Sequence, residues 1–142
     1  MKIVFFSYFF EPDLSAGAFR AKSLTESLSN IKNDINEIHV ITTHPNRYAS
    51  FKAESNDTSV ESNVVIRRIS VRQHASSITG QFYSFFTYFL KSYLIVRKID
   101  PDLMICTTSR HMTGLMTAIF SLIFKKKYFI DIRDIFSETI SN

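Results

Sequence analysis

The chain has 142 residues, of which 45% are hydrophobic and 21% charged, and its formal net charge is +4 at pH 7. This length and hydrophobic fraction fit one globular domain with one core and exclude a disordered chain. The small positive charge favours anionic partners such as phosphate groups or a membrane surface. The basic residues form only short groups without an aromatic-basic repeat, so we do not expect nucleic-acid binding.

The single cysteine and the amino terminus bear on the compartment. Cys106 lies in an apolar run and has no internal partner for a disulfide, which favours a reducing compartment and a buried thiol. The apolar start mimics a signal peptide, but Glu11 and Asp13 stand where cleavage would occur. The apolar stretches 82–96 and 112–124 are shorter than the ~20 residues that a bilayer core requires. We therefore expect a cytoplasmic protein.

The first half of the chain alternates strands with a helix. The apolar run 2–6 is too short for a helix and is typical of a central parallel strand. Apolar residues then recur at three- and four-residue steps from Ala18 to Leu28, which predicts an amphipathic helix with Ser15 as N-cap. Strands are predicted over 37–42 and 63–70, the second nearer the sheet edge.

Between these two strands, the polar stretch 44–62 is rich in Ser and Asn and is predicted to be a long loop. A loop of this length in a compact domain is either mobile or functional.

The second half continues the same alternation. A long crossover helix is predicted over 80–98, then a strand over 103–106, a polar loop that can cap a helix through 114–124, and a last strand over 127–131. Residues 136–140 look like the start of another helix. The crossover helix carries a wide apolar face that we assign mainly to the core: Phe82, Phe85, Phe86, Phe89, Tyr93 and Val96.

The repeated strand-helix pattern predicts the fold class. We expect an α/β domain of Rossmann-like, doubly wound architecture, with a parallel sheet in the order 3-2-1-4-5 and helices on both faces. No internal repeat, low-complexity tract or interdomain linker divides the chain, so 1–142 is predicted to be a single domain.

Polar residues follow the strands at the edge where open α/β sheets bind their ligands. The helix start at Ala16 and Gly17 offers free backbone N–H groups to a phosphate or a sugar hydroxyl, although a merely small helix start explains it as well. It is not a dinucleotide fingerprint, because the further glycines are missing.

A charged cluster follows the last strand. Asp131, Asp134 and Glu138 can bind a hydroxyl or act as bases, and Arg133 can hold an anion. The alternative is a helix-capping Asp134 within a solvated cluster. The four histidines lack metal-ligand spacing, so no metal is expected.

Three segments in order carry a family resemblance. The first is 2–13, followed by Gly17, Ala18 and Arg20; the second is 99–102, followed by Thr107–Ser109 and Gly114; the third is 131–138, with the sequence DIRDIFSE. Together they resemble the first strand and loop, the "P-D" strand and the "D-[VI]-R-D-L-W-P-E" segment of family 4 glycosyltransferases of the GT-B architecture. Ala16 stands where the family often has a second glycine, and Ser137 where proline is frequent.

This resemblance implies that the chain is the amino-terminal, acceptor-side domain of a retaining glycosyltransferase. Such an enzyme moves a sugar from a nucleotide-diphosphate sugar to a lipid-linked saccharide in O-antigen or capsular polysaccharide synthesis, and needs no other cofactor. The donor is bound chiefly by a second domain, expected to be absent here or supplied by a partner chain, so the chain alone is expected to be inactive. No catalytic residue is assigned. The substrate-binding residues implied are Ala16, Gly17, Arg20, Ser109, His111, Asp131, Arg133, Asp134 and Glu138.

Other interpretations stay open. The chain can be a non-enzymatic Rossmann-like module that binds a phosphorylated ligand or a protein, or one half of a split glycosyltransferase. The basic residues and aromatics of 82–98 can dock on the inner face of the cytoplasmic membrane, where lipid-linked acceptors lie, or the aromatics can simply pack in the core.

Overall fold

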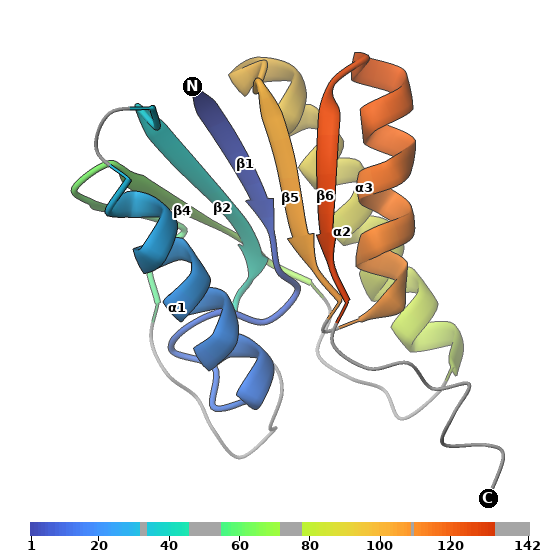
Figure 1. Ribbon diagram of the computed structural model, residues 1–142. Helices are drawn as coiled ribbons and strands as arrows, with labels where there is room; N and C mark the ends of the chain where they lie inside the picture. The colour runs from blue at the N-terminus through green and yellow to red at the C-terminus, as the bar shows by residue number, and fades with distance from the viewer. Residues whose placement is uncertain (32–33, 46–54, 72–77, 109, 133–142) are drawn as a thin grey trace, which may run out of the picture.

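A computed structural model describes residues 1–31, 34–45, 55–71, 78–108 and 110–132 (Figure 1). These residues form a six-stranded sheet flanked by three helices, a Rossmann-like α/β arrangement. In chain order the elements are β1 (Lys2–Phe6), α1 (Ala16–Ser29), β2 (Glu37–Thr43), β3 (Thr58–Glu61), β4 (Val64–Ile69), α2 (Ile78–Ile99), β5 (Leu103–Thr107), α3 (His111–Phe124) and β6 (Lys127–Asp131).

The sheet has the order β3-β4-β2-β1-β5-β6. Its five parallel strands, β4-β2-β1-β5-β6, follow the predicted order 3-2-1-4-5. β3 was not predicted: it pairs antiparallel with β4 through a two-residue connection in which Ser62 has a φ of 57°. The prediction of loop throughout 44–62 is therefore wrong over Thr58–Glu61, and residues 46–54 lie outside the described part.

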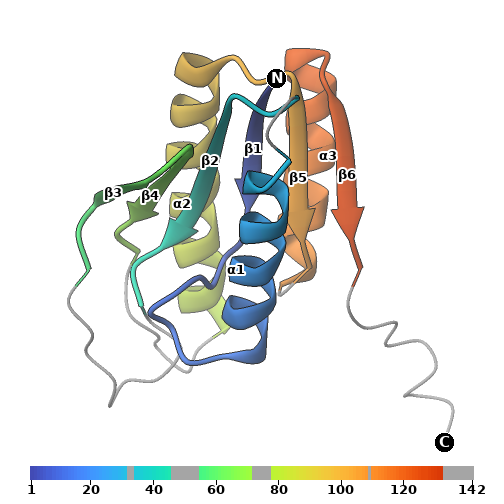
Figure 2. The same cartoon turned by 60° about the vertical axis from the view of Figure 1, so that its left-hand side comes forward.

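Helices cover both faces of the sheet. α1 packs on one face, and α2 and α3 lie side by side on the other (Figures 1 and 2). The alternation of side chains along β1 divides the core in two, because Ile3 and Phe5 join the cluster beneath α1 while Val4 and Phe6 join the cluster beneath α2 and α3. β1 is thus buried on both faces, as expected of a central parallel strand.

Helix α1 begins as predicted. The Ser15 side-chain oxygen accepts a hydrogen bond of 3.1 Å from the Ala18 backbone N–H. The start of α3 differs, because Arg110 occupies the N-cap position and makes no side-chain cap bond. The polar loop after β5 therefore does not cap α3 through that residue.

The long helix α2 is anchored by a buried tyrosine. Tyr88 is fully buried and its hydroxyl donates a hydrogen bond of 2.7 Å to the Ile41 carbonyl of β2. Phe85 and Val96 are buried beside it, whereas Phe82 and Phe86 are 67% and 48% exposed. The assignment of these two phenylalanines to the core is wrong, because α2 turns other side chains toward the sheet and toward α3. In the described part of the chain, neither α2 nor any other helix is long and apolar enough to cross a membrane.

Candidate functional site

The loop that follows β1 is tied to its neighbours by backbone-directed hydrogen bonds. The Ser7 hydroxyl donates to the Phe9 carbonyl over 2.6 Å, and the Thr43 hydroxyl donates to the Tyr8 carbonyl over 2.7 Å. Ser7 and Thr43 are buried, so a hydroxyl without a hydrogen-bond partner there would destabilise the fold, and these two bonds avoid that loss. The loop leaves the carboxyl edge of the sheet in a fixed path and ends at the N-cap of α1.

A double hydrogen bond joins α1 to the last strand across this edge. The Arg20 Nε donates to Asp131 Oδ2 over 2.8 Å, and Arg20 Nη2 donates to Oδ1 over 2.7 Å. The hydrogen bond to Asp131, with its negative charge, raises the pKa of the Arg20 guanidinium. This fork-to-fork geometry fixes the orientation of both groups, and Asp131 is the less exposed partner.

A second arginine closes the same edge from the loop between β5 and α3. The guanidinium carbon of Arg110 lies 4.2 Å from the centre of the Tyr8 ring and 5.5 Å from that of Phe9. This cation-π contact holds the β5–α3 loop against the loop after β1. Burial raises the pKa of Tyr8, and the positive charge of Arg110 acts in the opposite direction.

The loop after β5 also reaches the end of β6. The Thr108 backbone N–H donates to the Asp131 carbonyl over 3.0 Å. Gly114, in the first part of α3, lies against Thr108 and Ile130, and a Cβ there would stand 3.5 Å from the Thr108 methyl carbon. The residues that follow β1, β5 and β6 therefore form one connected edge.

The predicted site residues fall into three groups. Arg20 and Asp131 are in direct contact, and Ala16 and Gly17 begin the helix that carries Arg20. His111 is the exposed first residue of α3. The other predicted residues lie outside the described part of the chain: Ser109, Arg133, Asp134 and Glu138.

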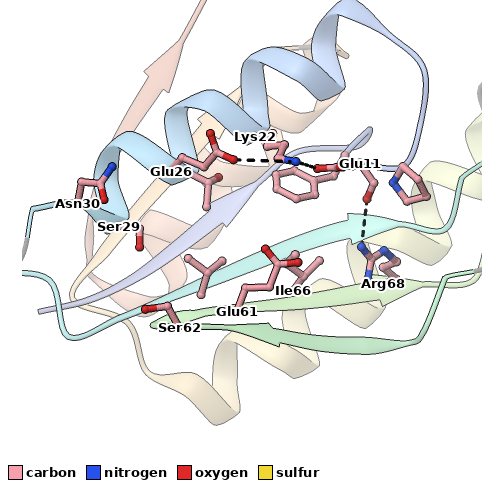
Figure 3. Close-up of a pocket in the computed structure, with 13 residues that line it drawn as sticks. Glu11, Lys22, Glu26, Ser29, Asn30, Glu61, Ser62, Ile66 and Arg68 are labelled. Carbon is pink, nitrogen blue, oxygen red and sulfur yellow. Dashed lines mark hydrogen bonds and ion pairs between the residues drawn. The ribbon is translucent and has the colours of Figure 1, made fainter.

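A groove of about 550 Å³ lies beside this edge, between α1 and the strands β3 and β4 (Figure 3). Lys22 of α1 forms an ion pair with Glu11 and lies 4.0 Å from Glu26. The hydrogen bond with Glu11 raises the pKa of the Lys22 amine. The floor is apolar, and its rim carries hydroxyl, amide and carboxylate groups.

Arg68 lies at one end of the groove (Figure 3). It is the residue before the end of β4, and its Nη2 donates to the Glu11 carbonyl over 3.0 Å while its Nη1 donates to the Ser59 hydroxyl over 2.5 Å. Burial lowers the pKa of Arg68. Glu11, in the loop after β1, therefore contacts both sides of the groove. Its carbonyl accepts a hydrogen bond from Arg68 of β4, and its carboxylate pairs with Lys22 of α1.

The sequence analysis missed three cations near the edge: Lys22, Arg68 and Arg110. Arg68 and Arg110 follow the same rule that selected the other candidates, since each lies at or just beyond the carboxyl end of a parallel strand. Lys22 has no such signal, because its position in the groove depends on how α1 packs.

Two other reactive side chains are buried or already hydrogen-bonded. Burial raises the pKa of the Cys106 thiol to about 11, so the thiol is protonated near neutral pH and is a poor nucleophile. His44 in turn has both ring nitrogens engaged, 2.9 Å from the Ser55 hydroxyl and 2.8 Å from an Asp57 oxygen. Within the described ranges, no group of three or more His, Cys, Asp or Glu side chains is placed to hold a metal ion.

No protein-family model matches this chain, and no curated protein sequence matches it. A guanidinium, a helix start with free N–H groups and several carboxylates can together bind a ligand that has both anionic and hydroxyl groups.

Proposed function

We propose that the chain is the acceptor-side domain of a retaining glycosyltransferase that moves a sugar from a nucleotide-diphosphate sugar to a lipid-linked saccharide. One observation supports this most: the Arg20–Asp131 pair joins the first and the third of the resembling segments, 111 residues apart, at one edge of the sheet. An open parallel sheet binds its ligands at this edge.

In this proposal the start of α1 faces the donor. The backbone N–H groups of Ala16 and Gly17 and the positive end of the helix favour a diphosphate or an electron-rich sugar edge. Arg20 adds a positive charge one turn along, and two of its nitrogens are fixed by Asp131. Its Nη1 has no hydrogen-bond partner among the described residues and can donate to a ligand.

The acceptor binds on the side of Asp131 and the segment that follows it. Arg133, Asp134 and Glu138, together with Ser109 and His111, are assigned to positioning its hydroxyl and diphosphate groups. No side chain is assigned as the catalytic base, because in a retaining transfer the leaving phosphate can accept the proton. The donor's nucleotide is held chiefly by a second domain or a partner chain, in the cytoplasm, at the inner face of the membrane that holds the acceptor.

Ligand-observed NMR of the full chain tests this assignment. Saturation-transfer spectra are recorded with uridine and guanosine diphosphate sugars and with short lipid-diphosphate saccharides. We expect signals from the saccharide acceptors and weak or no signals from the nucleotides. Asp131→Asn and Arg20→Gln should weaken the acceptor signals, whereas the control Lys2→Gln, at the opposite edge of the sheet, should not.

Two outcomes would contradict the proposal. Tight nucleotide binding by this domain alone would favour an independent nucleotide-binding module. Acceptor signals that survive both edge variants unchanged would move the binding site elsewhere.

A further inference from the structure

The outer faces of α2 and α3 are unusually apolar. Among the residues that the structure describes, eighteen large hydrophobic side chains are exposed, and ten of them lie on these two helices. Leu122 is 80% exposed and Phe82 is 67% exposed, as much as many charged surface residues in other proteins. The ten residues are Ile78, Phe82, Tyr83, Phe86, Leu90, Leu94, Met112, Leu115, Leu122 and Ile123.

These side chains form one continuous surface, because the two helices lie side by side and run in the same direction. Phe89 of α2 packs on Phe120 of α3 with ring centres 4.9 Å apart, and Tyr93 packs on Phe124 at 5.4 Å. These contacts fill the seam between the helices. Both helices lie on the side of the sheet opposite α1 (Figure 2).

The charges on this surface have one sign. Helices α2 and α3 contain no Asp or Glu, so all thirteen acidic residues of the chain lie elsewhere. Lys91 lies within α2 and donates to the Ser70 carbonyl, whereas Arg97 and Lys98 lie in the last turn of that helix. Each helix leads directly into a strand, and β5 and β6 pair in parallel from Leu103 and Lys127, so both helices end at the amino edge of the sheet.

This edge carries a basic rim formed by Arg97, Lys98, Lys125, Lys126 and Lys127. Lys126 forms an ion pair of 2.9 Å with Asp100, which joins the two helix ends. Arg97, Lys98, Lys125 and Lys127 are exposed at the same edge. An apolar face whose helices carry no carboxylate, with a rim in which five cations outnumber Asp100, complements an anionic phospholipid surface. Apolar side chains enter such a surface while Lys and Arg bind the headgroups.

We infer that the outer face of α2 and α3 docks on an anionic phospholipid surface. In this contact the axes of both α2 and α3 would lie along the membrane surface. It is a surface distinct from the carboxyl edge and leaves the Arg20–Asp131 edge unobstructed, because the rim lies at the opposite edge of the sheet. The proposed function supplies a reason for the contact, and the test below uses no sugar ligand.

Co-sedimentation of the full chain with lipid vesicles tests the inference. We expect binding to vesicles of phosphatidylglycerol and phosphatidylcholine, much weaker binding to phosphatidylcholine alone, and loss of binding in high salt. Changing Arg97, Lys98 and Lys127 to Gln should lower the partition coefficient about fivefold per charge removed.

The apolar part is tested by Phe82→Ser combined with Leu122→Ser, which should lower the partition coefficient at least about tenfold. Both residues are exposed, so the fold should persist, as far-ultraviolet circular dichroism will show. The matched control is Phe19→Ser, an equally exposed phenylalanine (59%) on α1, and it should bind like the original chain.

Three results would overturn the inference. The first is no binding to anionic vesicles, and the second is an equal loss for Phe19→Ser. The third is a dimer in sedimentation equilibrium that the Phe82→Ser and Leu122→Ser variant dissociates, because a second copy of the chain would then cover the face. None of these results bears on the NMR test of the carboxyl edge.

Discussion

Removing the hydroxyl of Tyr88 tests how α2 is held on the sheet beneath the candidate site. Tyr88→Phe keeps the ring, which packs at 5.2 Å against Tyr8, and deletes the hydroxyl that donates a hydrogen bond of 2.7 Å to the Ile41 carbonyl and interacts with the buried Ser92 hydroxyl. That carbonyl also accepts a bond of 3.2 Å from the Ser7 N–H, so it is not left without a partner. The expected loss is therefore the net value of one buried hydrogen bond, about 1 kcal/mol.

The magnitude converts directly into a melting temperature. Unfolding entropy is about 2.1 cal/mol/K per residue, so a chain of 142 residues has roughly 0.3 kcal/mol/K, and a loss of ~1 kcal/mol lowers Tm by about 3 °C. Differential scanning calorimetry of the full chain measures this shift. The matched control is Tyr83→Phe on the same helix, whose side chain is 60% exposed. It should move Tm by no more than about 1 °C, because surface substitutions usually change stability very little.

An unchanged Tm for Tyr88→Phe, or a shift equal to that of Tyr83→Phe, would refute the reasoning. It would mean that the Tyr88 hydroxyl does not donate to β2 in solution and that α2 is held by ring packing alone.

Further predictions concern titration and packing. Burial raises the pKa of Tyr88 well above 10.0, so the unfolded chain releases this proton first, and above pH ~10 stability should fall by up to about 1.4 kcal/mol per pH unit for this group. Urea denaturation should show a shallower alkaline decline for Tyr88→Phe, and an equal decline would contradict the burial of the hydroxyl. Cys106 should resist a thiol reagent at pH 8 in the native state and react promptly in denaturant; rapid native labelling would mean that the thiol is accessible. Gly114→Ala should leave the free energy of unfolding unchanged or raise it by at most about 1 kcal/mol, with Tm unchanged or slightly higher. A Cβ there meets Thr108 at an ordinary 3.5 Å, and alanine favours the helix. A clear drop in Tm would show that α3 needs a closer approach to that loop.

The parallel core of the fold was predictable because its signals are local. Lys2–Phe6 is an apolar run too short for a helix, and the apolar spacing from Ala18 to Leu28 has the helical period. Both predictions are confirmed by the structure. The short strand Thr58–Glu61 was missed because it carries no alternating apolar pattern and its turn contains no glycine.

The candidate site was predictable in place but not in its contacts. The carboxyl ends of parallel strands meet at one edge, so Asp131 could be assigned there from the order of elements alone. Its partner could not, because Arg20 is 111 residues away and the pair depends on the tilt of α1 over the sheet. The exposure of Phe82 was missed for a related reason: a helix with apolar residues on more than one side does not reveal which side meets the sheet.

The position of β1 in the sheet has a consequence for biosynthesis. Of the six strands that the structure describes, β1 is made first and lies inside the sheet, with β2 on one side and β5 on the other. Pairing with β2 closes a loop of only a few tens of residues. In contrast, β5 begins roughly a hundred residues after the end of β1, and β6 follows it on the same side. Arg20 is therefore made well before Asp131, and the pair at the carboxyl edge can form only after β6 has been made. A ribosome-bound chain ending before β6 would contain α1 but not the Arg20–Asp131 pair that joins this helix to the sheet.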